Sequence, residues 1–210
     1  MFAKYKDYAF LITLSYLTLG LIYPLFGYVM ALCMVTAIGI SIFAGRKWCG
    51  TLCPRGFLYD KFLGHNKKKA IPKWLKAKET RWAFFAVFMS VFAWRVYLTG
   101  GDVYAIGSVF ITMGIISGLI GLGLGIFYKT RSWCAICPMG TMASWFSSLR
   151  AKPAALTLAA DCRGCRVCEK SCPMDVPIVS YKSTEPAPVA DNACIKCKVC
   201  VSTCPRGAIV

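Results

Sequence analysis

Two stretches near the C-terminus carry the most specific pattern in the chain: Cys162-Arg-Gly-Cys165-Arg-Val-Cys168-Glu-Lys-Ser-Cys172-Pro173 and Cys194-Ile-Lys-Cys197-Lys-Val-Cys200-Val-Ser-Thr-Cys204-Pro205. Each reads C-x2-C-x2-C-x3-C-P. Three thiolates at this spacing can hold one face of an iron-sulfur cube, while the fourth cysteine of each run reaches the other cube. The proline that follows keeps the chain from continuing as a helix. The two stretches therefore predict a pair of cluster sites with crossed ligands.

The pattern is that of bacterial two-cluster ferredoxins, and it predicts two 4Fe-4S clusters. The ligands assigned to the first cluster are Cys162, Cys165, Cys168 and Cys204. The ligands assigned to the second cluster are Cys194, Cys197, Cys200 and Cys172. A zinc ribbon or a disulfide knot is the alternative, but zinc needs only four ligands per site and a cytoplasmic face disfavours disulfides. We expect residues 161–210 to form a small α+β domain of the bacterial ferredoxin type, after a linker over residues 151–160.

The rest of the chain is far more apolar than a soluble domain. Of its 210 residues, 57% are hydrophobic and only 16% are charged, and the mean hydropathy is +0.56. This composition excludes a simple cytosolic globule and indicates segments within lipid. The formal net charge of +16, taken alone, suggests nucleic acid or an anionic membrane surface as partner. Because cluster thiolates among the 13 cysteines return negative charge, we expect no nucleic-acid partner.

Four apolar stretches predict an α-helical membrane bundle within residues 1–150. No charged residue occurs from Tyr8 to Ala44, and one helix of that length would reach about 55 Å, nearly twice the roughly 30 Å of a hydrocarbon core. The chain must therefore turn, and the Pro24-containing segment Tyr23–Gly27 is the predicted corner. The predicted spans are Tyr8–Ile22, Tyr28–Ala44, Trp82–Leu98 and Val103–Tyr128. A cleaved signal peptide is the alternative for residues 1–30, but the run is too long and lacks an Ala-x-Ala cleavage site.

Basic residues gather on one side of this predicted bundle. Residues 46–81 contain eleven Lys or Arg residues against only Asp60 and Glu79, whereas the turn at Thr99–Asp102 has no Lys or Arg. The positive-inside rule then places the large loop, both termini and the C-terminal domain on the cytoplasmic side. We expect a multi-pass protein of the cytoplasmic (inner) membrane.

Four further cysteines follow the second and the fourth predicted span in matching segments. The segments run from Gly45 to Gly56 and from Lys129 to Gly140, and they share basic residues, then Trp-Cys, then Cys-Pro-x-Gly. They form an internal repeat about 85 residues apart, with the same orientation in the membrane. If the halves pack about an axis along the membrane normal, the cysteines that converge into a four-thiolate set are Cys49, Cys53, Cys134 and Cys137.

At these residues the chain resembles the NapH/NosR-type membrane ferredoxins, polytopic proteins with paired Cys-x3-Cys-Pro motifs and a cytoplasmic two-cluster ferredoxin tail. The resemblance covers nearly the whole chain, and it implies electron transfer with quinol oxidation as the known theme. Two features depart from the family. The second pair, Cys134 and Cys137, is one residue shorter, and the large extracytoplasmic domain that carries flavin in NosR-like members is missing.

The role of the four converging cysteines has three interpretations. A third 4Fe-4S cluster matches their number, a redox-active dithiol pair matches the C-x-x-C spacing, and a structural role is the third. Cys33 lies alone inside the second predicted span and is expected to be a small packed residue.

Two functions fit these motifs. In the first, the protein relays electrons between a cytoplasmic redox partner and a membrane quinone or partner subunit, as a component of an oxidoreductase complex that oxidises quinol or reduces quinone. In the second, it is an accessory or maturation factor that supplies electrons to a metalloenzyme or metal centre. His65 is the only histidine, so an ordinary bis-His haem is excluded. No catalytic motif beyond electron transfer is present.

Overall fold

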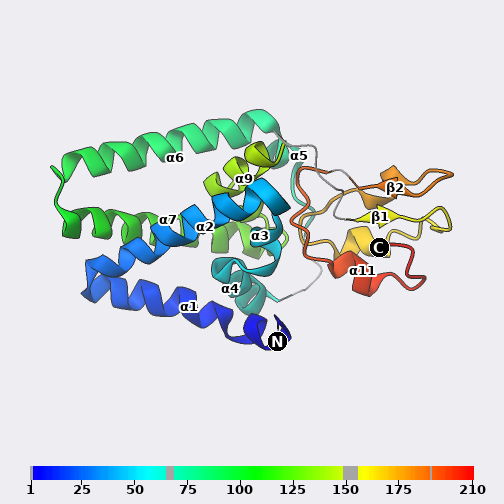
Figure 1. The fold of residues 1–210 in the computed structure, drawn as a ribbon, viewed down its shortest axis with the longest axis horizontal. Coiled ribbons are helices and arrows are strands. Elements are labelled where there is room, and N and C mark those ends of the chain that lie inside the picture. Colours follow the sequence, from blue (N-terminus) through cyan, green and yellow to red (C-terminus); the bar gives the residue numbers. More distant parts are fainter. Residues whose placement is uncertain (1, 65–68, 149–155, 190) are drawn as a thin grey trace.

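The structure is a computed structural model that describes residues 2–64, 69–148, 156–189 and 191–210. Four long helices pack beside one another along the longest axis, and a cysteine-rich module lies at one end of them (Figure 1). The long helices, with the short 3-10 turn between the first two, are α1 (Phe2–Ile22), η1 (Pro24–Phe26), α2 (Gly27–Ala44), α6 (Lys78–Leu98) and α7 (Val103–Phe127). Short helices between them and the module are α3 (Lys47–Thr51), α4 (Pro54–Leu63), α5 (Lys73–Lys76), α8 (Trp133–Ile136) and α9 (Pro138–Ser148).

The predicted corner at Tyr23–Gly27 is confirmed. Helix α1 ends at Ile22, Pro24 opens η1, and α2 begins at Gly27. A Cβ atom at Gly27 would collide with the carbonyl oxygen of Gly107 in α7, so glycine at this position lets the corner touch the neighbouring helix. The second corner is the predicted turn before α7, where the Asp102 carboxylate caps that helix by accepting a 3.1 Å hydrogen bond from the Tyr104 N–H. Both corners lie at the end of the molecule far from the module (Figure 1).

The long helices expose an unusually apolar surface. Three helical stretches are long and apolar enough to cross a membrane: Pro24–Ala44, Lys78–Leu98 and Val103–Phe127. The apolar part of α1, Tyr8–Ile22, is shorter. Helix α6 has no buried residue, and large side chains such as Leu32, Val87 and Leu119 are more than 60% exposed. Because water would not favour such a surface, the helices are compatible with a membrane protein.

The C-terminal module (residues 156–210) is built from two similar halves around a small core. Its elements are β1 (Thr157–Leu158), α10 (Val167–Ser171), η2 (Ile178–Tyr181), β2 (Ala187–Pro188) and α11 (Val199–Thr203). Strand β1 pairs antiparallel with β2, and Thr157 also exchanges two backbone hydrogen bonds with Val210. The core side chains that are at most 2% exposed include Leu156, Leu158, Met174, Ile178, Ile195 and Ile209.

One part of the predicted linker belongs to this module. Leu156 and Leu158 are buried in the core, because pairing with β2 and with the C-terminal residues carries them inward. Residues 151–155 of that linker, like His65, lie outside the described residues.

Candidate metal centres

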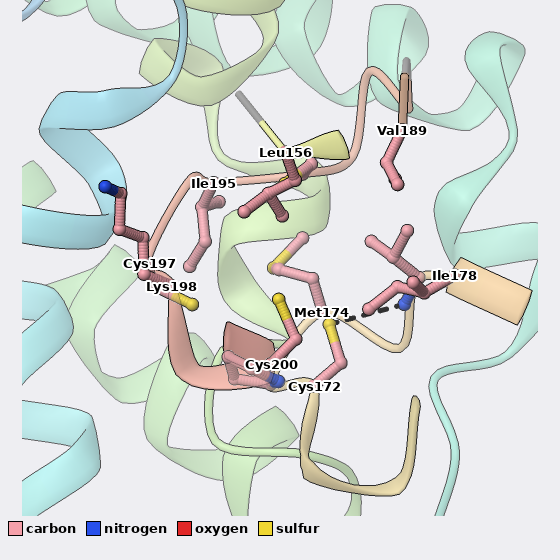
Figure 2. Close-up of a pocket in the computed structure, with 12 residues that line it drawn as sticks. Leu156, Cys172, Met174, Ile178, Val189, Ile195, Cys197, Lys198 and Cys200 are labelled. Atoms are coloured by element: carbon pink, nitrogen blue, oxygen red, sulfur yellow. Dashed lines mark hydrogen bonds between the residues drawn. The ribbon is translucent and has the colours of Figure 1, made fainter. Parts of the chain in front are cut away.

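Four cysteines of the C-terminal module line one cavity of about 20 Å³. They are Cys172, Cys194, Cys197 and Cys200. Three come from the second motif and one from the first, which is the crossed combination that the motif predicts. Figure 2 shows the sulfur atoms of Cys172, Cys197 and Cys200 directed toward a shared space. Burial, followed by the neighbouring thiolates, raises the pKa of Cys200 to about 12. The structure brings this set together, and its assignment to one cluster stays a prediction.

The other predicted set of cysteines is less buried from solvent. Cys162, Cys168 and Cys204 pack on the same apolar core as the second set, and Cys168 is buried. Burial raises the pKa of the Cys168 thiol, with Cys162 among the further contributors. Cys165 is exposed at the surface. The two sets therefore differ in their access to solvent.

The two motifs share one backbone conformation. Arg166 and Lys198 immediately precede α10 and α11 and have left-handed φ angles of 57° and 62°. Two positions earlier, Gly164 and Lys196 are also left-handed, with φ angles of 74° and 55°. Left-handed backbone costs a non-glycine residue roughly 1–3 kcal/mol and persists where the surroundings impose it, often at ligand sites. The repeated strain indicates that both loops are shaped for the same kind of ligand.

The cysteines of the two Cys-Pro repeats line a single cavity of about 110 Å³, which we call the interface cavity. These four interface cysteines are Cys49, Cys53, Cys134 and Cys137. Burial raises the pKa of Cys49 to about 11 and that of Cys134 to about 12. Both thiols are therefore protonated near neutral pH without metal, and metal binding would release their protons. The convergence predicted from the repeat is present in the structure.

The same local construction delivers each pair. In both repeats a short helix, α3 or α8, carries the first cysteine, and the second cysteine is the residue before the next helix. Its N–H donates a 2.9 Å hydrogen bond to the carbonyl oxygen of Trp48 or Trp133. Pro54 or Pro138 then opens α4 or α9, because proline suits the first turn of a helix. This construction turns both cysteines of a pair toward one space.

Two arginines tie the repeats together crosswise. Arg46 Nη2 donates to the carbonyl oxygen of Cys134, and Arg131 Nη1 donates to that of Cys49 at 2.8 Å. A Cβ atom at Gly140 would collide with Arg46, and one at Gly56 would collide with Arg131. The glycine of each Cys-Pro-x-Gly segment therefore makes room for the arginine of the other repeat.

The charges around the interface cavity favour an anionic occupant. Arg131 is paired with Asp60 through bonds as short as 2.6 Å, and although burial opposes ionisation, Asp60 raises the pKa of Arg131 above its usual range. Arg46 and Arg55 line the cavity and make no ion pair with any carboxylate in the described part of the chain. Arg46 Nε, Arg55 Nη2 and Trp133 Nε1 are buried without a hydrogen-bond partner. Since buried charges are normally paired, a cube held by four thiolates fits this cavity in charge and in donor supply.

The spacing of these cysteines is not that of a single-ion site. Among the described residues, no group of three or more His, Cys, Asp or Glu side chains is arranged to hold one metal ion. A 4Fe-4S cube carries an iron at each of four corners, so its thiolates stand farther apart than the ligands of one tetrahedral zinc. No disulfide bond joins any of the 13 cysteines.

The interface cavity lies next to the C-terminal module. A Cβ atom at Gly50 would collide with the carbonyl oxygen of Ile195, which stands between two cysteines of the second set. Arg46 Nη1 also donates to the carbonyl oxygens of Asn192 and Ala193, at 3.2 and 3.4 Å. The loop that carries Cys194 and Cys197 is thus seated directly on the segment that carries Cys49 and Cys53.

A second contact between the two parts is ionic. Asp175 of the module lies 3.0 Å from Lys129 Nζ and 3.5 Å from Lys76 Nζ, and Lys129 also donates a 2.8 Å hydrogen bond to the carbonyl oxygen of Cys172. Burial works toward a higher pKa of Asp175, but the two lysines outweigh it and lower that pKa. Basic residues of the helical part therefore hold the module at Asp175 and Cys172 as well as at the Cys194 loop.

The role of some site residues was not predicted from the sequence. Arg46 and Arg131 counted there only as basic charge, although an aligned Arg-x-Trp-Cys in both repeats was a signal for their shared role. Cys33 was expected to be a packed residue, and it is half-buried in the wall of the interface cavity. Nothing in the local sequence points to that position.

Two family models match the chain. The model described as a 4Fe-4S binding domain matches residues 26–72 and 110–154, and the model described as a 4Fe-4S dicluster domain matches residues 161–209. The first model covers both Cys-Pro repeats, and the second covers both ferredoxin-type motifs. The chain is therefore a ferredoxin-like iron-sulfur protein that binds 4Fe-4S clusters, and the matches indicate iron-sulfur electron transfer.

Two proteins of Methanocaldococcus jannaschii are similar over most of the chain. The uncharacterized protein MJ0749 is 28% identical over 182 residues, which cover 83% of this chain and 68% of that protein. The uncharacterized protein MJ0750 is 25% identical over 194 residues, which cover 84% of this chain and 76% of that protein. No solved structure matches the chain.

Proposed function

We propose that the protein is a membrane-bound relay that carries electrons between a cytoplasmic redox partner and a membrane quinone or partner subunit. The observation that carries this proposal is the contact between Gly50 and Ile195. It joins a four-cysteine cavity at the end of the apolar helices to a four-cysteine cavity of the ferredoxin-like module. Two redox sites in such close contact serve electron transfer better than either site would alone.

The interface cysteines are proposed to hold a third 4Fe-4S cluster. Their convergence, the unpaired arginines around them and the match of both repeats to a 4Fe-4S binding model support this assignment. In the module, we assign the two crossed sets of cysteines to one cluster each. A 4Fe-4S cluster bound at each site supplies one-electron uptake and release. The chain itself contributes the thiolates, the arginine charges and the exclusion of water.

The membrane orientation is proposed from charge. The module, the described residues of the basic segment 46–81 and both interface segments share one end of the bundle, and the two corners share the other end (Figure 1). The positive-inside rule assigns the basic end to the cytoplasm. All four long helices then cross the membrane, with α1 as the shortest apolar span, as in the NapH/NosR-type architecture that the chain resembles.

A second cavity offers a place for a quinone. It measures about 50 Å³ and lies beside the interface cavity, with which it shares Arg55, Trp133, Cys137, Met30, Met34 and Met139. Its wall is formed mainly by Met and Phe side chains of α2, α6 and α7, including Met30, Met34, Phe88, Phe92, Phe110 and Met113. Such a wall suits an apolar ring, and the unpartnered Trp133 Nε1 is available to a carbonyl oxygen.

Iron analysis tests the proposal. Anaerobically purified protein is expected to contain about twelve iron and twelve acid-labile sulfide per chain, the sum of three 4Fe-4S clusters. Cys134→Ser should reduce both to about eight. Cys33→Ser is the matched control, because Cys33 lines the same cavity outside the paired motifs and its loss should leave the iron content unchanged. Eight iron in the wild-type protein would refute the interface cluster and favour dithiol chemistry.

A further inference from the structure

The two ferredoxin-type motifs are equivalent in sequence spacing but not in surroundings. After its first cysteine, the second motif has Ile195, which is 2% exposed, and the first motif has Arg163, which is exposed. The next cysteine in each motif differs in the same way, since Cys197 is half-buried and Cys165 is exposed. The module therefore has one covered edge and one open edge.

The covered edge rests on the membrane part of the chain. Ile195 packs against Gly50, and the preceding residues Asn192 and Ala193 accept hydrogen bonds from Arg46. A partner that approaches the module from solution must use a different face.

The open edge is basic and surrounds an exposed cysteine. The residues that form it are Arg163, Cys165, Arg166, Val167, Lys170, Pro205 and Arg206, and all of them are exposed. Four of these are cations, whereas the acids beside them in the sequence are Asp161, directly before the motif, and Glu169 within it. Arg166 makes one long ion pair with Glu169, at 3.9 Å, and its side chain is 72% exposed. Most of its guanidinium is therefore accessible to a partner. Val167, 37% exposed, adds an apolar side chain next to Arg166.

We infer that this open edge is the docking surface for a small acidic protein that carries single electrons. The inference rests on the proposed relay function and names the partner at its soluble end. Complementary charge steers such a partner to the exposed Cys165 and orients it there. The competing explanation is that these cations only offset the negative charge of the bound clusters, and in that case no partner binds at this edge.

The test is the affinity of the full-length protein in detergent micelles for an acidic two-cluster ferredoxin used as probe. Arg163→Glu combined with Arg166→Glu should weaken binding by about tenfold or more at low salt, and high salt should abolish the difference. The matched control is Lys73→Glu combined with Lys182→Glu, because both lysines are exposed, lie outside the two motifs and give the same change in net charge. These two changes together should alter the affinity by less than about twofold.

The visible absorbance of the clusters is recorded for each variant. Weaker binding with unchanged absorbance supports the docking surface. Unchanged binding in the arginine double variant would overturn it, and so would equal weakening by the lysine double variant, which would assign the effect to net charge. Loss of absorbance with retained binding would instead show that the arginines stabilise the clusters, and it would also overturn the inference. Because the measurement needs neither an interface cluster nor a quinone, the relay proposal can fail without affecting this result.

Discussion

Arg131 Nη1 donates a 2.8 Å hydrogen bond to the carbonyl oxygen of Cys49, 82 positions earlier in the chain. The acceptor is a backbone group, so the bond fixes the course of the first repeat and leaves the thiol free for a ligand. Arg46 makes the equivalent bond to Cys134 in the opposite direction. The interface cavity is therefore a joint product of both repeats.

Arg131→Met should destabilise the protein by about 2–3 kcal/mol, because it leaves the partly exposed Asp60 without its partner and frees the Cys49 carbonyl. Thermal unfolding in detergent measures the loss. The double variant Arg131→Met with Asp60→Asn should recover part of it, since the unpaired charge is gone. A double variant less stable than the single variant would contradict the role given to this pair.

Gly50→Ala should weaken the seating of the module on the membrane part by about 1–3 kcal/mol, because the added methyl group meets the backbone of Ile195. Hydrogen exchange should become faster around Ile195 while the iron content stays the same. Gly123→Ala is the matched control, since its Cβ atom would meet nothing within 4 Å. Equal exchange in both variants would contradict a tight contact at Gly50.

Cys168→Ser and Cys172→Ser should damage different clusters although the two residues are four positions apart. Cys172 lines one cavity with the cysteines of the second motif. Cys168 instead lies close enough to Cys162 for the charge of Cys162 to raise its pKa. Electron paramagnetic resonance of the reduced variants distinguishes the two signals. Loss of the same signal in both variants would refute the crossed assignment.

Serine substitution at each of the four interface cysteines should remove one and the same spectroscopic signal while both module clusters survive. A cube that lacks one thiolate at the membrane surface is open to solvent and easily lost. Independent dithiols would instead give matching phenotypes within each pair and unchanged iron. Iron content and paramagnetic resonance of the four variants decide between these outcomes.

Asp175→Asn should weaken the contact between module and membrane part by about 1 kcal/mol, because its two lysine partners are partly exposed. The lowered pKa of Asp175 keeps the carboxylate charged at neutral pH. Its contribution is therefore constant from about pH 8 to about pH 5 and disappears only on further acidification. Hydrogen exchange of the module at low and high salt measures the effect, and the wild-type advantage should shrink at high salt. A salt-independent difference would argue against an ionic contact.

Local signals explain which features the sequence predicted. Pro24 ends a helix through its fixed backbone and Asp102 caps the next one, so both corners could be predicted. The repeated Cys-Pro segments predicted that the interface cysteines converge. Contacts between distant segments carry no such signal. The burial of Leu156 depends on strand pairing with residues far along the chain, and the seating of Ile195 on Gly50 depends on how two separate units meet.

The crosswise arginine bonds also set an order of events during synthesis. Cys49 and Cys53 leave the ribosome first, and the residues that complete their cavity follow about 85 positions later. At about 5–20 residues per second this interval is roughly 4–17 s. During that time the first repeat has no Arg131 to hold its backbone, so the cluster proposed for this cavity can be inserted only after the second repeat has been made. The interface cavity is thus completed as one late event, however early its first cysteines are made.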